Sequence, residues 1–102
     1  MFLRLTFFKA IPEKVDELRA IYQKEIIPEV RKQKGNLEVR LLEPVNKADD
    51  FVSMTGWKTQ ADAEAYDSSG LYREMVHKLD GLFTKTPELK SYNSESVPAP
   101  VL

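Results

Sequence analysis

The sequence predicts an α+β fold whose elements follow one another in the order βαββαβ. Short segments alternate between apolar and polar residues as strands do, and the longer segments between them carry apolar residues at helical spacing. The length of 102 residues and the hydrophobic fraction of 42% suit a single domain with one core. The most compact arrangement of this order is ferredoxin-like, an antiparallel sheet covered on one face by both helical segments.

The first strand is predicted over residues 2–8, and a long helix follows it. Pro12 suits the first turn of this helix, and Gly35 ends it after a group of basic residues. Pro28 lies inside the helix, where it lacks an N–H and presses on a carbonyl one turn earlier. We therefore expect a bend or a loosened turn between Glu25 and Pro28.

The second and third strands are predicted over residues 36–42 and 51–57, and a loop at residues 43–49 joins them as a hairpin. Alternation along the third strand places four of its residues on one face: Phe51, Ser53, Thr55 and Trp57. A fourth strand is predicted over residues 87–93.

The helical segment after Trp57 is predicted to be broken. Thr59 can cap its start by accepting a hydrogen bond from the backbone N–H of Asp62, and the first part runs to Tyr66. The DSSG sequence at residues 67–70 interrupts the helix. A second part carries apolar residues at helical spacing: Leu71, Tyr72, Met75, Val76, Leu79, Leu82 and Phe83. The break opens space above the sheet, which predicts a small-molecule pocket there.

The domain is predicted to cover residues 1–93, and residues 94–102 are predicted to form an irregular C-terminal arm. The face of the sheet away from the helices is expected to be more apolar than a solvated face, through Phe2, Phe8, Leu42, Val52 and Met54. We therefore expect a homodimer in which two sheets pack face to face. A monomer with scattered apolar surface residues is the alternative.

Composition excludes several classes of site. The chain has no cysteine and one histidine, so it offers no disulfide framework, thiolate nucleophile or histidine-rich metal site. Its net charge is −1 with acids and bases interspersed, which favours neither nucleic acid nor an anionic membrane as a partner. We find no long apolar run, and the start, MFLRLTFF, lacks the features of a signal peptide. A cytoplasmic location is the expectation.

The candidate pocket residues lie on the third strand and on the broken helix. Trp57 can form a wall and donate its indole N–H, and a buried Ser53 hydroxyl would need a hydrogen-bond partner. Tyr66 and Tyr72 can pack their rings and leave their hydroxyls at a pocket mouth. Each residue has a purely structural alternative, as a core aromatic ring or as a hydroxyl bonded to the backbone.

Two runs carry a resemblance to a known family: SMTGWKTQADAEAY at residues 53–66 and GLYREM at residues 70–75. With the order of elements, they resemble the antibiotic biosynthesis monooxygenase family of dimeric α+β barrels over residues 2 to about 93. The resemblance implies a pocket between helices and sheet. In the quinone-forming members an Asn and a Trp line this pocket, and they match Ser53 and Trp57 here. Their tyrosine falls on Ala63 and their arginine on His77.

The resemblance implies a monooxygenase without cofactor or metal, which uses O2 to oxidise a small phenol-like or hydroquinone-like aromatic molecule. In this interpretation Trp57 is a wall and N–H donor, and Ser53 is a hydrogen-bond donor. Tyr66 and Tyr72 orient the substrate, and His77 is a candidate base. A helical wheel places His77 nearly opposite the apolar stripe of its helix, which favours a solvated side chain.

Two alternatives stay open. A non-catalytic dimeric module could hold a small hydrophobic ligand in the same pocket. The chain could also bind or degrade haem, since the haem-degrading members of the family carry pocket residues that match Leu3, Tyr66 and His77. Two of those three matches lack the residue type that these members use.

Overall fold

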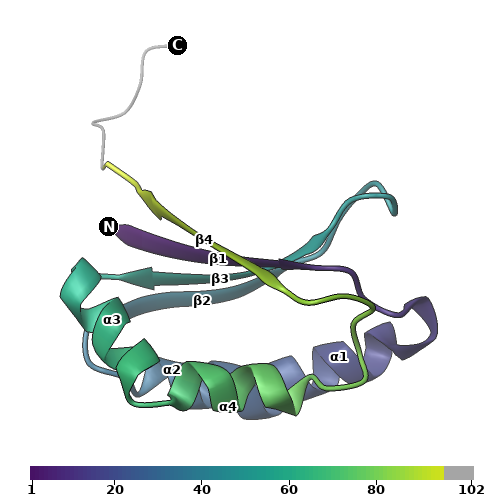
Figure 1. The fold of residues 1–102 in the computed structure, drawn as a ribbon, viewed down its shortest axis with the longest axis horizontal. Helices are drawn as coiled ribbons and strands as arrows, with labels where there is room; N and C mark the ends of the chain where they lie inside the picture. The colour runs from purple at the N-terminus through teal and green to yellow at the C-terminus, as the bar shows by residue number, and fades with distance from the viewer. Residues whose placement is uncertain (96–102) are drawn as a thin grey trace.

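The sheet is antiparallel and has the order β2-β3-β1-β4, as the computed structural model shows for residues 1–95 of the chain (Figure 1). Its strands are β1 (Phe2–Phe8), β2 (Asn36–Leu42), β3 (Phe51–Trp57) and β4 (Glu88–Asn93). This is the predicted ferredoxin-like arrangement, in which the central strands β1 and β3 lie side by side. Residues of β1 and β3 that are paired in register therefore share a face.

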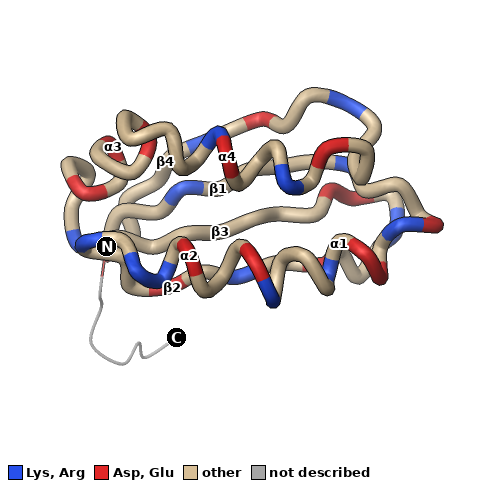
Figure 2. The backbone as a smooth tube through the Cα atoms, turned by 90° about the horizontal axis from the view of Figure 1, so that it is seen from below, with Lys and Arg blue, Asp and Glu red and all other residues tan. Residues whose placement is uncertain are grey.

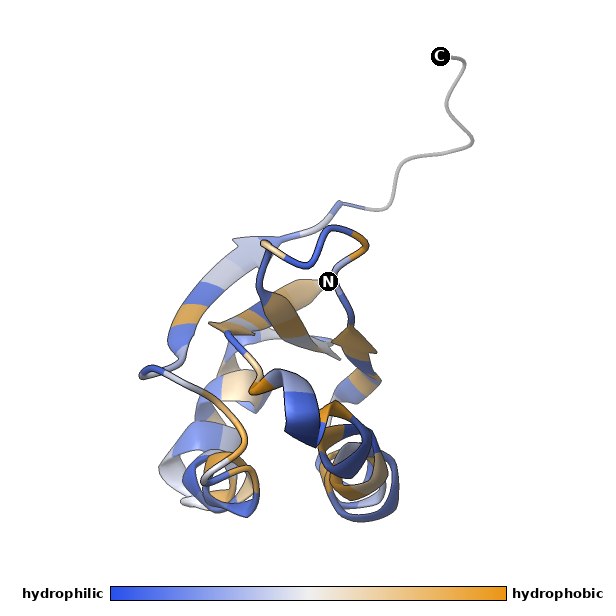
Figure 3. Cartoon of the chain, turned by 90° about the vertical axis from the view of Figure 1, so that its right-hand side faces the viewer, coloured by the Kyte–Doolittle hydropathy of each residue, from blue (hydrophilic) through white to orange (hydrophobic). Residues whose placement is uncertain are grey.

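The helices cover one face of the sheet in two columns (Figure 3). The first column contains η1 (Pro12–Lys14), α1 (Val15–Ile21), the π-helical turn η2 (Tyr22–Ile26) and α2 (Ile27–Arg31). The second contains α3 (Gln60–Ser68) and α4 (Leu71–Lys78). The widened turn η2 directly precedes α2, which contains Pro28. This turn overlaps the loosened turn that was expected between Glu25 and Pro28, and it begins three residues earlier.

Charges on the first column follow the helix dipole. Acidic residues gather near the start of α1 and basic residues near the end of α2 (Figure 2). The first turns contain Glu13, Asp16 and Glu17, and the end of α2 contains Arg31. Negative charge near a helix N-terminus and positive charge near its C-terminus are both stabilising.

The broken helix begins as predicted and ends earlier. The backbone N–H of Asp62 donates a hydrogen bond of 3.1 Å to Thr59 Oγ1, which caps α3. The second part, α4, stops at Lys78, so Leu82 and Phe83 follow it in turns. Gly81, at a φ of 80°, takes the left-handed conformation that ends a helix. Leu82 nevertheless stays buried, because the turns fold its side chain back onto the core.

The prediction for the faces of β1 is wrong. Phe8 is 2% exposed and Phe2 packs against the core, so both lie on the helix side of the sheet. The opposite, outer face instead carries Leu3, Leu5 and Phe7, which pair with Gly56, Met54 and Val52 of β3. Alternation could not decide between the faces, because both carry large apolar residues and the face that is buried also carries Arg4 and Thr6.

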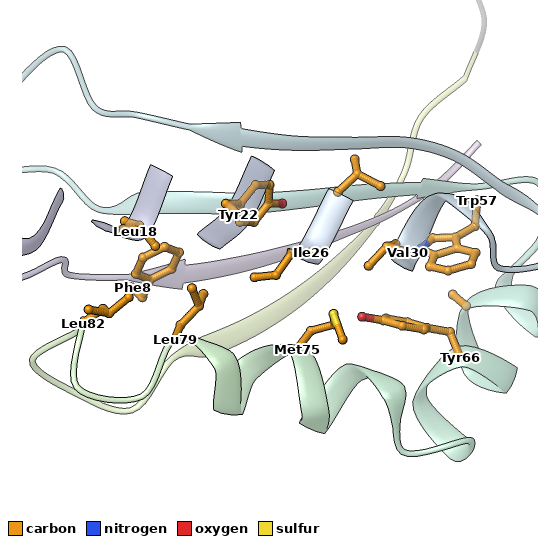
Figure 4. Close-up of a cluster of buried hydrophobic side chains, with 12 residues drawn as sticks. Phe8, Leu18, Tyr22, Ile26, Val30, Trp57, Tyr66, Met75, Leu79 and Leu82 are labelled. Carbon is orange, nitrogen blue, oxygen red and sulfur yellow. The ribbon is translucent and has the colours of Figure 1, made fainter. Parts of the chain in front are cut away.

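The core fills the space between the sheet and the two columns (Figure 4). Leu18, Trp57 and Ala63 are fully buried there, and Tyr22 and Val30 are 1% exposed. Beyond β4, the backbone N–H of Ser94 donates a hydrogen bond to the Met1 carbonyl oxygen. The predicted C-terminal arm reaches past the described residues, so residues 96–102 of that prediction lie outside them.

Candidate functional site

A cavity of about 50 Å³ lies between the sheet and α4. Its polar lining consists of Arg4 and six hydroxyl-bearing residues: Thr6, Tyr22, Ser53, Thr55, Tyr66 and Tyr72. The apolar side chains that complete the lining include Phe8, Ile26, Met75 and Leu79. The pairing of β1 with β3 brings four of these polar residues together, since Thr6 lies opposite Ser53 and Arg4 lies opposite Thr55. The predicted pocket is therefore present, with more hydroxyl groups than the sequence indicated.

The cavity adjoins an open groove of about 530 Å³ at the turn between α3 and α4. The groove is lined by Asp67, Ser68, Tyr72, Arg73, Val76, Thr86 and Pro87. Tyr72, Val76 and Pro87 line both spaces. These three side chains, called the partition below, thus lie between the cavity, which is lined mostly by apolar surface, and the accessible groove.

Ser53 belongs to a hydrogen-bond chain that ends on the backbone. The Tyr22 hydroxyl donates to the carbonyl oxygen of Arg40 at 3.1 Å and lies 2.8 Å from Ser53 Oγ. A tyrosine hydroxyl has one proton, so Ser53 donates to Tyr22. Ser53 is therefore left as a hydrogen-bond acceptor toward the cavity, in place of the predicted donor.

Tyr22 should make the fold sensitive to alkali. Burial raises the pKa of Tyr22 to about 12, although the hydrogen bond with Ser53 acts in the opposite direction. An unfolded tyrosine titrates near pH ~10, so between these values the unfolded chain loses a proton that the folded chain keeps. The free energy of unfolding should fall across this range, by roughly 2 to 3 kcal/mol from this group. Urea unfolding at several pH values should show a shallower fall for Tyr22→Phe, and equal falls would contradict the assignment.

Trp57 lies behind the cavity and does not line it. Its side chain is fully buried, and its indole N–H donates to Thr55 Oγ1 at 2.9 Å. The indole ring stacks on the ring of Tyr66, with centroids 5.2 Å apart. The predicted N–H donor is thus already paired within the protein, and Trp57 acts on the cavity by holding Tyr66.

Tyr66 and Tyr72 both line the cavity, as predicted. The Tyr66 ring packs edge-on against the Tyr72 ring, with centroids 6.2 Å apart, and the Tyr66 hydroxyl points toward Met75 (Figure 4). No hydrogen-bond partner for this hydroxyl occurs among residues 1–95, whereas the Tyr72 hydroxyl lies 3.3 Å from Thr6 Oγ1. Burial raises the pKa of Tyr66 well above its ordinary value, and the neighbouring Tyr22 adds to this rise. Tyr66 therefore presents a protonated hydroxyl to the cavity.

His77 lies apart from these residues. Its side chain is 66% exposed on α4, and its Nδ1 lies 3.0 Å from Asp80 Oδ2. His77 is absent from the cavity lining. The structure thus brings Ser53, Tyr66 and Tyr72 together, places Trp57 behind Tyr66, and leaves His77 at the surface.

Arg4 and Tyr22 are the residues that sequence reasoning missed. Arg4 Nη2 donates to Asp67 Oδ2 of α3 at 2.7 Å. Tyr22 lies on η2 of the first column and lines the cavity, with its hydroxyl 2.8 Å from Ser53 Oγ. The available signal was that β1 and β3 carry polar residues at positions that pair with each other. This signal can be used only when the register of the two strands is known.

A family comparison assigns the chain. The family model described as antibiotic biosynthesis monooxygenase matches residues 1–78. The chain belongs to the antibiotic biosynthesis monooxygenase family. No curated protein matches its sequence. Within residues 1–95, no helix is long and apolar enough to cross a membrane.

Solved structures of this antibiotic biosynthesis monooxygenase type share the fold. A Deinococcus radiodurans protein, provisionally described as such a monooxygenase, is 16% identical, with a TM-score of 0.79 and 99% of each chain covered. A Nitrosomonas europaea protein with the same provisional description is 15% identical, with a TM-score of 0.74, covering 92% of this chain and 98% of that one. The haem degrader MhuD from Mycobacterium tuberculosis, solved with two haems in its active site, is 16% identical, with a TM-score of 0.77. That match covers 96% of this chain and 100% of MhuD.

Proposed function

We propose that this family member is a cofactor-independent monooxygenase that acts on a small phenol-like or hydroquinone-like substrate. The observation that carries the proposal is the Tyr66 hydroxyl, which is protonated, faces a buried cavity and has no partner among the described residues. The residue is 7% exposed and its hydroxyl stays accessible from the cavity, so a ligand oxygen there can pair with it. The aromatic and hydroxyl-rich lining suits a ring that carries one or more oxygen atoms.

The proposed reaction consumes one O2 and forms one quinone and one water. The substrate loses its phenolic proton, and the phenolate passes one electron to O2. The resulting radicals combine into a peroxide at a ring carbon, and this peroxide loses water to leave a carbonyl. One oxygen atom ends in the quinone and the other in water, so the substrate supplies both the electrons and the protons. The protein supplies position, water exclusion and hydrogen bonds to the developing oxyanion.

Substrate entry requires the partition to move. A cavity of about 150 Å³ is known to accept benzene, so the closed cavity of about 50 Å³ is too small for an aromatic ring. The groove outside is large enough and shares three side chains with the cavity. We propose that the ring enters from the groove between Tyr72, Val76 and Pro87 and reaches the hydroxyls from that side.

Oxygen uptake tests the proposed function. Purified protein, freed of metals and flavin, is incubated with anthrones, hydroquinones and catechols in an oxygen electrode, and heat-unfolded protein serves as the control. We expect catalysed uptake with at least one class, and a quinone product formed in equal amount. If none of these compounds causes catalysed oxygen uptake, the proposal is contradicted.

A non-catalytic binding module is the second candidate, and the small cavity is the observation that favours it. If the partition does not open, the hydroxyl groups can hold one or two waters and fix the core. Ligand binding without oxygen uptake would select this alternative. The two candidates therefore differ in one measurement on the same protein.

Haem does not fit the described site. The chain has a single histidine, and His77 is exposed at the surface of α4 and absent from the cavity lining. The cavity of about 50 Å³ is also far smaller than a porphyrin needs. We therefore propose no haem chemistry for this chain.

We also propose that the outer face of the sheet joins a second copy of the chain. All helices lie on one side of the sheet, so no helix within residues 1–95 covers the outer face (Figure 1). This face carries Leu3, Leu5 and Phe7 of β1 and the neighbouring Val52 and Met54 of β3, all of them half-buried. A contiguous apolar face of this kind favours association. A cytoplasmic location and a domain boundary at residue 93 stay predictions of the sequence alone.

Met54→Lys should convert the proposed homodimer into a monomer. The substitution would bury an unpaired ammonium group from each copy, which should weaken the dimer by roughly a hundredfold or more. Light scattering at micromolar concentration measures the change. The control Ala65→Lys adds the same charge to an exposed position of α3 and should leave the dimer intact. A wild-type protein that is monomeric at this concentration would refute the proposal.

A further inference from the structure

Among residues 1–95, Arg4 is the one charged residue that lines the cavity. Its side chain is 11% exposed, so its guanidinium group is largely withdrawn from water. A buried cation is costly unless hydrogen-bond acceptors surround it. The cavity therefore carries a positive charge that needs acceptors.

Protein acceptors satisfy this charge only in part. Arg4 Nη2 donates to Asp67 Oδ2 at 2.7 Å, and no other hydrogen bond of the guanidinium occurs among residues 1–95. An arginine has five N–H donors and can pair with a carboxylate through two of them. This single bond therefore leaves most of the guanidinium N–H donors free. Within the part of the chain that the structure describes, Asp67 Oδ1 is buried without a hydrogen-bond partner, whereas the remaining Arg4 donors are unpaired but not fully buried. The ion pair holds Arg4 in place without using up its donors.

The pair lies at the boundary between the cavity and the groove. Arg4 lines the cavity and Asp67 lines the groove, while Tyr72 of the partition lines both. The guanidinium carbon of Arg4 lies 5.9 Å from the centroid of the Tyr72 ring. A ring that entered across the partition would thus pass beside the free donors of Arg4.

We propose that Arg4 binds the ionised oxygen of the substrate, so that the site takes up the phenol as its phenolate. This inference rests on the proposed function and names the form of the substrate that the site selects. The phenolic proton passes to water in the groove, and no electron moves in this step. Asp67 is a positioning residue that fixes the guanidinium. The phenolate is the electron-rich form that the proposed reaction with O2 requires.

The probe for this proposal is 4-nitrophenol, an electron-poor phenol whose anion absorbs at longer wavelength than its neutral form. We titrate it with protein at a pH where the free probe is neutral. A cation within about 4 to 6 Å lowers the pKa of an acid by roughly 1 to 3 units, so the bound probe should ionise about 10-fold to 1,000-fold more readily. Arg4→Met should abolish this gain, and Arg4→Lys should keep part of it.

Two controls separate the charge from the fold. Nitrobenzene lacks the hydroxyl, so its binding should be similar in the wild type and in Arg4→Met, which also shows that the variant is folded. Arg31→Met removes an exposed arginine of α2 and should leave the ionisation of the probe unchanged. Asp67→Asn removes a negative charge 2.7 Å from the guanidinium, which by itself favours the anion. Ionisation that nevertheless falls in this variant, while nitrobenzene still binds, identifies Asp67 as a positioning residue, and ionisation that rises or stays unchanged contradicts that role.

The outcomes distinguish this inference from the proposed function. If the wild type binds 4-nitrophenol in its neutral form, or if Arg4→Met leaves its ionisation unchanged, the inference fails, whatever the oxygen uptake shows. If the probe binds as the anion but no substrate consumes oxygen, the inference stands and the binding module is selected. If neither probe binds to the wild type, the inference and the proposed pocket both fail.

Discussion

Trp57→Ala should lower the free energy of unfolding by roughly 3 to 5 kcal/mol. The side chain is fully buried, stacks on Tyr66 at 5.2 Å and donates its indole N–H to Thr55 Oγ1. Truncation to alanine would remove the ring contacts, leave a cavity and leave the Thr55 hydroxyl without this donor. A domain of ordinary stability has about 5 to 15 kcal/mol in total, so the variant should be marginal. Urea unfolding at neutral pH measures the loss.

Trp57→Phe is the matched variant for this prediction. It keeps an aromatic ring against Tyr66 and removes only the indole N–H and part of the ring, so it should lose clearly less stability than Trp57→Ala. Equal losses in the two variants would show that ring packing is not the cause. A loss below about 1 kcal/mol in Trp57→Ala would contradict the buried position altogether.

Tyr66→Phe should lower the turnover number for any substrate that consumes oxygen by about a hundredfold, the usual effect of removing one donor to a developing oxyanion. The expected stability change is small, because the lost hydroxyl has no partner among residues 1–95 and its ring stays in place. Steady-state oxygen uptake measures turnover, and urea unfolding measures stability. The two readouts together separate a role in the reaction from a role in the fold.

Tyr92→Phe controls for the chemistry of the Tyr66 substitution. Tyr92 pairs with Leu3 on the outer face of the sheet, is 47% exposed and is absent from the cavity lining, so turnover should stay unchanged in Tyr92→Phe provided that light scattering shows the oligomeric state of the wild type. If Tyr66→Phe turns over as fast as the wild type, the Tyr66 hydroxyl is not the oxyanion donor. The proposed role of the cavity would then lose its main support.

The order of elements was predictable from sequence because each boundary has a local physical signal. Alternation defines the β3 face that carries Ser53 and Trp57, and Thr59 caps α3 as its sequence pattern indicates. The end of α4 was not predictable in the same way. Apolar spacing continues to Leu82, whereas the backbone leaves the helix after Lys78 and Gly81 then takes a left-handed conformation.

The site was predictable only in part, because it depends on the pairing of distant strands. Periodicity identified Tyr66 and Tyr72 as aromatic residues of the broken helix, and both line the cavity. Arg4 could not be found in this way, since a face with Arg4 and Thr6 indicates solvent in the sequence, whereas packing against the helices turns this face inward. The Tyr22–Ser53 hydrogen bond likewise joins residues of η2 and β3, which no local pattern connects.

A crystal structure of the protein with bound 4-nitrophenol tests the central claim most directly, because it shows where a phenol lies. We expect the ring between Tyr72, Val76 and Pro87, with these side chains displaced and the phenolic oxygen within hydrogen-bond distance of Arg4 or Tyr66. A phenol bound only on the outer face of the sheet, or a cavity that stays closed at saturating ligand, would contradict the account.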